Sequence, residues 1–169
     1  MTALKTYGGH GRANLSRRAR AGGRIGLMEE AAMPRFVVQQ HFRAEDDWHF
    51  DLMLECQEAL VTFSSGVAPD ETKRLPTAVR QLPNHRLAYL EHEGEVSGDR
   101  GWCKIHDRGA FEWIKPAAAS CPVARVGETA CDLLDEIVVR LAGEKTTGVY
   151  RLAREAASGL DYWRLRKET

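Results

Sequence analysis

Two short polar segments of the chain carry residue types that bind transition metals. They are QQH at 39–41 and HFD at 49–51, and together they supply the imidazoles of His41 and His49 and the carboxylate of Asp51. Two histidines and one carboxylate suit Mn, Fe or Zn at a centre that keeps open positions and performs chemistry, rather than a closed structural site.

Strand alternation predicts that these side chains converge. Side chains two residues apart on a strand point to one face, so Gln39 shares a face with His41, and Met53 shares one with His49 and Asp51. If the two segments pair across the linker 42–48, which is long but allowed for a hairpin, His41 lies near the other two ligands. Met53 is then expected to border the same pocket. A solvated hairpin with three polar side chains and no metal is the alternative.

Several motifs, in order along the chain, resemble one known family. FVVQQH at 36–41 and HFDLMLE at 49–55 are followed by NHRLAY at 84–89, HEGEVSG at 92–98, WCKIHDRG at 102–109, LAGEKTTGVYRLAR at 141–154 and YWRLRK at 162–167. Together they resemble the 3′-phosphoesterase domain of bacterial DNA ligase D, over roughly residues 34–167. The NHRLAY and HFDLMLE segments are most similar to a free-standing variant of that family.

The resemblance implies a role for each candidate residue. His41, His49 and Asp51 are the implied ligands of one Mn²⁺, with Zn²⁺ as the second choice. His85 and Tyr89 are the implied catalytic residues. The imidazole would donate to a phosphoryl oxygen or protonate the leaving alkoxide, and the tyrosine would bind the same oxygens.

The expected substrate contacts are Gln39 and Arg80. Arg80, or Arg74 in another register, is expected to replace a family arginine that precedes an Ala-Val pair. A second family arginine is replaced here by Met53, and a thioether cannot supply the charged, bidentate contact of a guanidinium. Activity is therefore expected to be weakened, redirected to another substrate or lost.

The function implied by the resemblance is metal-dependent hydrolysis of phosphoesters at 3′ ends of DNA or RNA, an end-healing step of DNA repair. The alternative is a catalytically weak or inactive module of the same fold that binds nucleic-acid ends or a partner protein. A hydrolase of small phosphoesters is a third hypothesis. DNA or RNA 3′ ends are the implied partners, and a repair ligase or end-binding proteins are further candidates.

Length and composition indicate one globular domain. The chain has 169 residues, of which 43% are hydrophobic and 28% charged. No apolar run reaches the ~18 residues of a membrane helix, and the N-terminus lacks the apolar stretch of a secretory signal. We therefore expect a cytoplasmic protein that does not enter a membrane. The four cysteines form no C-x-x-C pair, and reduced thiols are expected.

After residue 33 the pattern predicts a mainly β, compact single-domain barrel with short helices and loops. The expected strands cover residues 35–41, 49–55, 59–64, 87–93, 102–107, 111–114, 137–141, 148–152 and 162–167. Pro83-Asn84 predicts a turn before His85, and residues 115–131, rich in Pro and Ala, predict an inserted loop. GEKT at 143–146 lacks the spacing of a phosphate-binding loop and predicts a hairpin turn.

The segment before the barrel, residues 1–33, is predicted to be a basic and disordered arm. Residues 1–27 contain six basic and no acidic residues, whereas the rest of the chain has 18 basic and 24 acidic ones. Such an arm could neutralise nucleic-acid phosphates. A solvated or targeting-like tail, or a translation start at Met28 or Met33, are the alternatives.

Overall fold

The structure is a computed structural model that describes residues 32–72, 75–117, 125–129, 134–155 and 162–168. Residues 1–31 of the predicted arm, Arg74 and most of the predicted 115–131 loop lie outside these residues. The elements are β1 (Arg35–Ala44), β2 (Asp47–Cys56), β3 (Ala59–Ser65), η1 (Pro69–Glu71), β4 (Thr77–Arg86), η2 (Leu87–Leu90), β5 (Gly94–Glu95), β6 (Trp102–Lys115), β7 (Glu136–Gly143), β8 (Thr147–Arg154) and β9 (Tyr162–Lys167). None of the described helices is long and apolar enough to cross a membrane.

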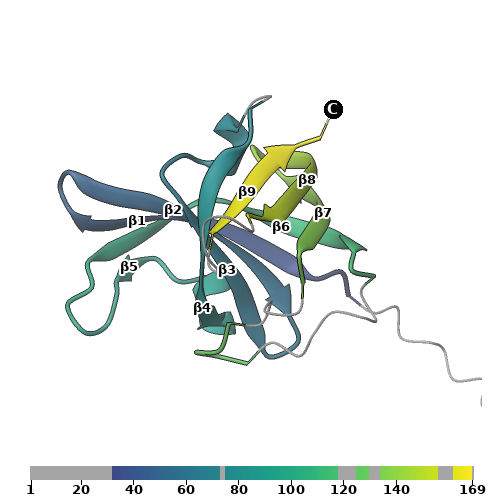
Figure 1. The fold of residues 1–169 in the computed structure, drawn as a ribbon. Helices are drawn as coiled ribbons and strands as arrows, with labels where there is room; N and C mark the ends of the chain where they lie inside the picture. The colour runs from purple at the N-terminus through teal and green to yellow at the C-terminus, as the bar shows by residue number, and fades with distance from the viewer. Residues whose placement is uncertain (1–31, 73–74, 118–124, 130–133, 156–161, 169) are drawn as a thin grey trace, which may run out of the picture. The chain divides into compact units, whose positions relative to one another are not determined.

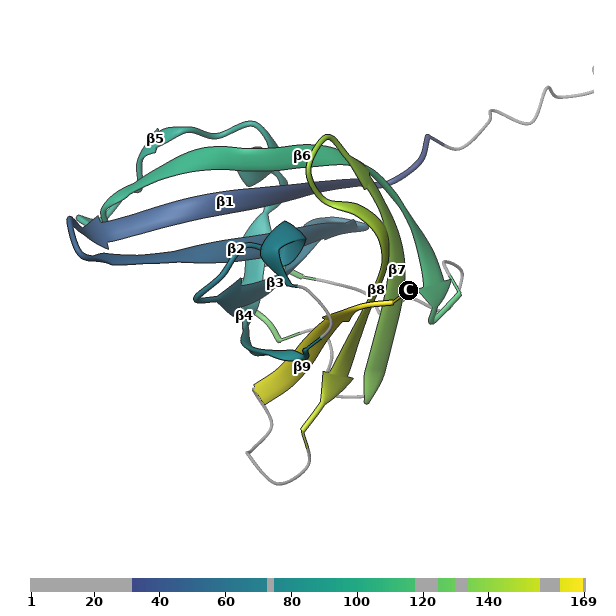
Figure 2. The same cartoon turned by 90° about the horizontal axis from the view of Figure 1, so that it is seen from above.

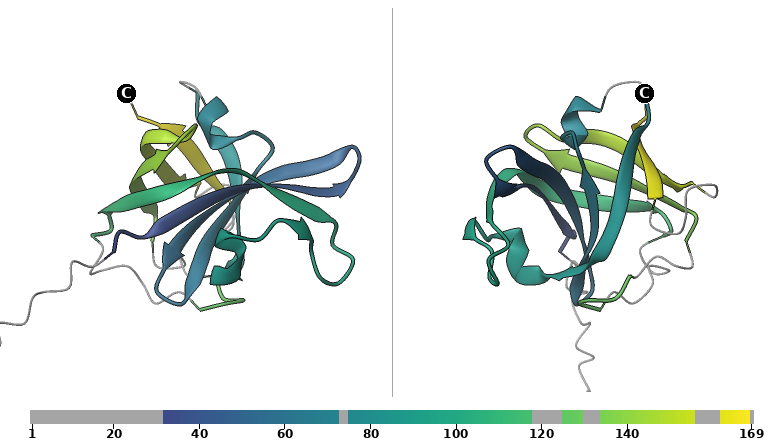
Figure 3. Two further views of the ribbon diagram at one scale, coloured as in Figure 1. Left: turned by 180° about the vertical axis from the view of Figure 1, so that it is seen from behind. Right: turned by 60° about the vertical axis from the view of Figure 1, so that its left-hand side comes forward.

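The strands close into an antiparallel barrel (Figure 1). Eight of them follow the order β1-β2-β3-β4-β9-β8-β7-β6, and β6 pairs with β1 to close the ring, while the short β5 adds to the free side of β6. Figures 2 and 3 show the turn end of the β1–β2 hairpin and the adjoining end of β6 extending past the barrel. The prediction of a mainly β barrel with short helices is confirmed.

An apolar core fills the barrel because alternate residues of each strand point inward. One buried cluster contains side chains from all eight strands of the ring, among them Phe36, Leu52, Phe63, Val79, Phe111, Val139, Tyr150 and Trp163. Residues of the opposite parity must therefore lie on the outer face of the barrel wall. His41 and Asp51 belong to that outer set.

The prediction of a turn at Pro83 and of a strand over residues 87–93 is wrong. Strand β4 continues through Pro83 to Arg86, and residues 87–90 form the 3₁₀ helix η2. The β3–β4 register shifts here, because Leu60 pairs with His85 and Thr62 with Leu82. Proline cannot donate to a ladder and is tolerated in a strand at such bulges, which is why Pro83 does not end β4.

Strand β6 is one continuous strand where the sequence predicts two. Arg108 and Gly109 suggest a break, but β6 runs through both and pairs with β1 and β7. A Cβ added at Gly109 would lie 2.2 Å from the carbonyl oxygen of Ala142. This glycine therefore permits close strand approach instead of a turn.

The expectation of reduced thiols is wrong for Cys56. This cysteine is disulfide-bonded. Cys103 is a free and buried thiol. A chain of this length does not need a disulfide for its core, but that argument does not exclude one between cysteines that the fold brings together.

The GEKT segment forms the hairpin turn between β7 and β8, as predicted. Asp107 holds this turn. Its carboxylate accepts backbone hydrogen bonds from Glu144, Lys145 and Thr146 at 3.2, 3.1 and 2.6 Å. Burial acts to raise the pKa of Asp107, but the hydrogen bonds from Thr146, Arg108 and Lys145 outweigh it and hold the pKa below its usual 3.8.

We expect Asp107→Asn to lower the free energy of unfolding at neutral pH by about 3 kcal/mol, because an amide cannot accept all of these charge-assisted bonds. A depressed pKa adds stability above the unfolded pKa and loses it as the pH falls through the folded pKa. The gap between wild type and variant should therefore be constant above about pH 5 and shrink below about pH 4. Urea unfolding at several pH values measures it. Asp46→Asn, which changes an exposed turn carboxylate, is the control. An equal loss of unfolding free energy in this variant would contradict the role of Asp107 in holding the β7–β8 turn.

Candidate metal centre

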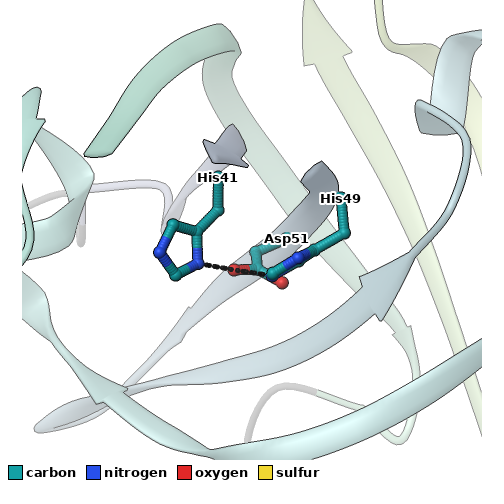
Figure 4. Close-up of side chains that lie close together, drawn as sticks. All are labelled: His41, His49 and Asp51. Carbon is teal, nitrogen blue, oxygen red and sulfur yellow. Dashed lines mark ion pairs between the residues drawn. The ribbon is translucent and has the colours of Figure 1, made fainter. Parts of the chain in front are cut away.

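The pairing of β1 with β2 brings the three predicted ligands together. His41 lies directly opposite His49, and Gln39 lies opposite Asp51. The side chains of His41, His49 and Asp51 converge from the two neighbouring strands (Figure 4). The pairing that the sequence predicts is therefore present, and all three side chains lie on the outer face.

The ligand atoms of this cluster are spaced as a metal requires. Asp51 Oδ2 lies 3.4 Å from His49 Nε2 and 3.9 Å from His41 Nδ1, and ligand atoms of all three residues lie within 4.8 Å of one another. Metal–ligand bonds of about 2.0–2.2 Å place neighbouring ligand atoms roughly 3–3.5 Å apart. Small side-chain shifts would complete such a centre.

A backbone carbonyl selects the tautomer of His41. His41 Nε2 lies 2.8 Å from the carbonyl oxygen of Arg100. Because a carbonyl only accepts, Nε2 must carry the hydrogen, and the neutral ring keeps its lone pair on Nδ1, the nitrogen near Asp51. Metal-binding histidines are commonly oriented by a hydrogen bond of this kind from the other ring nitrogen.

The buried carboxylate of Asp51 supports the fit of a metal. Asp51 is 3% exposed, and its Oδ1 has no hydrogen-bond partner. A buried carboxylate oxygen without a partner is costly, and a cation at this point would compensate it. The donor set, the His41 tautomer and this oxygen all fit a divalent metal.

Cys103 lies close to the cluster without joining it. It pairs with His41 across β1 and β6, but its thiol contacts the carbonyl oxygen of His92 at 3.8 Å. Burial and the nearby Glu93 raise the pKa of the Cys103 thiol. A protonated thiol is a poor metal ligand, so the described cluster remains two histidines and one aspartate.

A cleft of about 450 Å³ opens over the cluster. It follows a row of directly paired residues on the outer face, in which Asp51 pairs with Ser64, Ser64 with Arg80, and Arg80 with Tyr162. All four line the cleft. The predicted substrate contact Arg80 is thus brought to the metal cluster by the register of β2, β3 and β4.

His85 lines the same cleft because of the β4 bulge. Strict alternation would place His85 on the opposite face from Arg80, but the extra residue at Pro83 restores it to the outer face. His85 Nδ1 lies 2.8 Å from the carbonyl oxygen of Pro83 and donates to it. Its Nε2 therefore remains available for a ligand.

The other two predicted site residues lie beside the cleft instead of lining it. The Tyr89 ring makes an edge contact with His85, at 5.3 Å between centroids, and lines neighbouring clefts. Gln39 is 1% exposed and donates from its amide to the carbonyl oxygens of Tyr89 and His92 at 2.8 Å each. Gln39 thus ties η2 to β1, and its contact with substrate stays a prediction.

The prediction that Met53 borders the metal pocket is wrong. Met53 shares the outer face with Asp51, but η2 covers this part of the wall. The side chain is 1% exposed and packs with Val37, Leu60 and Leu90 in a small second cluster. An arginine at position 53 would have to bury its guanidinium among these apolar side chains. Substituting Met53 by arginine would therefore not by itself restore the contact that the family arginine makes.

Sequence reasoning missed two basic residues near the centre. Arg43 lines the metal cleft and pairs with Asp47 at 3.1 Å. It lies two residues after His41, so strand alternation was a sufficient signal. Arg100, whose carbonyl orients His41, lies in a loop that no motif marks. Tyr162 likewise gave no sequence signal, because it reaches the cleft only through the β4–β9 pairing.

We expect the substitutions His41→Ala, His49→Ala and Asp51→Ala each to weaken Mn²⁺ binding by about 10-fold or more. Mutating even a residue that only hydrogen-bonds to a metal ligand commonly lowers metal affinity by at least this much. Isothermal titration calorimetry with Mn²⁺ measures this. His106→Ala is a matched control, because His106 also pairs with an aspartate, Asp70, but lies outside the cluster. Undiminished affinity in the three ligand variants would exclude the site.

We also expect Gly101→Ala to weaken Mn²⁺ binding, by roughly 10- to 100-fold. A Cβ at Gly101, where φ is +92°, would lie 2.0 Å from the carbonyl oxygen of Phe42 and displace the loop that holds Arg100 against His41. Gly98→Ala is the control, since Gly98 has a φ of +81° but no neighbour closer than 3.8 Å. Equal losses in both variants would mean that backbone strain, and not the displaced carbonyl, is responsible.

A comparison with known families agrees with the geometry. A family model described as the DNA ligase D 3′-phosphoesterase domain matches residues 39–154, which include the metal cluster, Arg80 and His85. No curated protein matches the chain. Since the family match covers well over half of the sequence, the chain belongs to the DNA ligase D 3′-phosphoesterase domain family.

Proposed function

We propose that this protein is a metal-dependent phosphoesterase that heals 3′ ends of DNA or RNA. Membership of the family supports a phosphoesterase role in end-healing. The observation that carries the proposal is the convergence of His41, His49 and Asp51 in one cleft with Arg80 and His85. A repair ligase that seals the healed end is the class of partner that this activity needs.

His41, His49 and Asp51 would hold the metal, for which we propose Mn²⁺, with Zn²⁺ as the alternative. When bound, the metal would polarise a phosphoryl oxygen and lower the pKa of a bound water. The protein contributes a His41 ring fixed by the carbonyl of Arg100 and a buried carboxylate whose Oδ1 accepts no hydrogen bond.

Basic side chains of the cleft would bind the phosphoryl group. Arg80 is exposed and, within the part of the chain that the structure describes, forms no ion pair, so its guanidinium is available to the substrate. Arg43 adds a second guanidinium, shared with Asp47. Positive groups placed where negative charge develops stabilise the transition state.

His85 would act on the leaving group. Its Nδ1 is held by the carbonyl oxygen of Pro83, and the protonated ring would donate from Nε2 to the departing alkoxide. The ring contact with Tyr89 restricts its rotation. Tyr89 therefore positions His85, and the direct contact with phosphoryl oxygens that the resemblance implies is a further proposal.

The buried Met53 favours a second candidate, a binding module with little or no turnover. The family arginine at this position is missing, and Arg80 and Arg43 reach the cleft from other strands. If they do not replace it, the protein would still bind 3′ ends through its basic cleft. Mn²⁺-dependent release of product separates the two candidates.

We expect the wild-type protein to process a labelled primer-template that ends in a 3′-ribonucleotide or a 3′-phosphate. The activity should depend on Mn²⁺, stop when a chelator is added and return with excess metal. His85→Ala should lower kcat about 100-fold or more, as loss of a general acid does. Gel analysis of the labelled strand measures both. Mn²⁺ affinity should be unchanged in this variant.

His106→Ala serves again as the control, and its rate should equal that of wild type. If His85→Ala loses the metal, the division between ligands and acid is wrong. If wild type binds the end tightly but releases no product with either Mn²⁺ or Zn²⁺, the binding module is the correct function.

A further inference from the structure

A second cleft opens beside the metal cleft, and the proposed function gives it no ligand. It has a volume of about 320 Å³ and lies between the end of β4, η2 and the loop before β6. The two clefts share Leu82 and His85. One extended ligand can therefore occupy both, with His85 at the junction.

The lining of this second cleft is basic and aromatic. Arg86, Tyr89 and Arg100 contribute to it, and none of the described residues that line it is acidic. The Arg86 guanidinium lies over the Tyr89 ring, with Cζ 5.9 Å from the centroid. Arg100 is held in place, because its Nε and Nη2 donate to the carbonyl oxygen and hydroxyl of Ser97 at 2.8 and 3.3 Å.

This combination matches a single nucleic-acid strand. Bases stack on aromatic rings and on guanidinium planes, and arginines neutralise the phosphates between them. Charge alone would also suit an acidic protein surface, but the stacked Arg86 and Tyr89 pair favours a planar base.

We propose that the second cleft is a subsite for the nucleotide that precedes the reacting 3′ end. Its base would stack on the Arg86 and Tyr89 pair, and its phosphate would lie between Arg86 and Arg100. The inference rests on the proposed function, because it takes the 3′ end to lie at the metal cluster. Arg100 serves both clefts, since its carbonyl holds His41 while its side chain lines the subsite.

Binding tests the subsite without any turnover. Fluorescence anisotropy would follow a 5′-labelled single-stranded DNA of about 12 nucleotides with an unreactive 3′-hydroxyl end, in the presence of Mn²⁺ and over a range of salt. Arg86→Gln and Arg100→Gln should each weaken binding and lower the salt slope by about 0.7, the value for one lost phosphate contact on a single strand.

Arg140→Gln is the matched control. Arg140 is an exposed arginine of β7, paired with Glu112 at 3.5 Å, and it lines neither cleft. Its substitution removes the same charge and should leave the salt slope unchanged. The subsite would be overturned if the salt slopes of Arg86→Gln and Arg100→Gln equal that of the wild type. It would also be overturned if Arg140→Gln lowers the salt slope by the same amount as these two variants do. Absence of binding by the wild type would also overturn it.

Two substitutions of Tyr89 test the stacking. Tyr89→Phe keeps a flat ring and should bind as wild type does, whereas Tyr89→Leu should bind roughly 5- to 100-fold more weakly. Tyr89 also packs against the second apolar cluster, so unfolding temperatures of both variants are compared first. If the folded Phe and Leu variants bind equally, no base stacks here, and an acidic protein surface becomes the better ligand.

Rates of hydrolysis on two substrates distinguish a failure of this inference from a failure of the proposed function. Arg86→Gln should leave hydrolysis of bis(p-nitrophenyl) phosphate, a diester without a nucleotide, unchanged, and should lower kcat/KM on an oligonucleotide 3′ end. An equal loss on both substrates would contradict a subsite. If wild type hydrolyses neither substrate, the proposed function fails, and the anisotropy series still decides whether a strand binds in the second cleft.

Discussion

The register between β1 and β2 is the constraint on which the candidate centre depends. A slip of one residue would place His41 and His49 on opposite faces and would turn the core residues of one strand, such as Phe36 or Leu52, out of the barrel, because side chains alternate between the two faces. The buried core prevents this slip, since its apolar residues come from all eight strands of the ring. Packing inside the barrel therefore determines which polar residues meet outside it.

A buried carboxylate is the second element of the centre. Asp51 and Asp107 are both nearly inaccessible, but their surroundings differ. Asp107 is satisfied by backbone N–H groups of the β7–β8 turn, and its role is structural. Asp51 has an oxygen without a partner and two imidazoles beside it. The carboxylate of Asp51 is the one suited to bind a cation, since its Oδ1 accepts no hydrogen bond and two possible metal ligands lie beside it.

The bulge in β4 connects the metal cluster to the rest of the cleft system. It returns His85 to the face of Arg80, and it leads the chain into η2, which carries Tyr89. The same helix buries Met53, so the arginines that line the metal cleft, Arg43 and Arg80, come from β1 and β4 instead of from β2. Bulges often re-aim side chains at functional sites in this way. Here one inserted residue positions His85 between two clefts.

The cluster of candidate metal ligands could be predicted from the sequence because its geometry is local. His41, His49 and Asp51 lie on two consecutive strands, so alternation and the hydrophobic pattern suffice, and the spacing of strands and turns likewise predicted a closed barrel. Tertiary structure decided what depends on distant pairing and packing. It placed His85 at the cleft through a bulge in β4, where Pro83 in the sequence predicts a turn. It also buried Met53 beneath η2. Alternation reports the face of a strand on which a side chain lies, but only the packed fold determines which element covers that face.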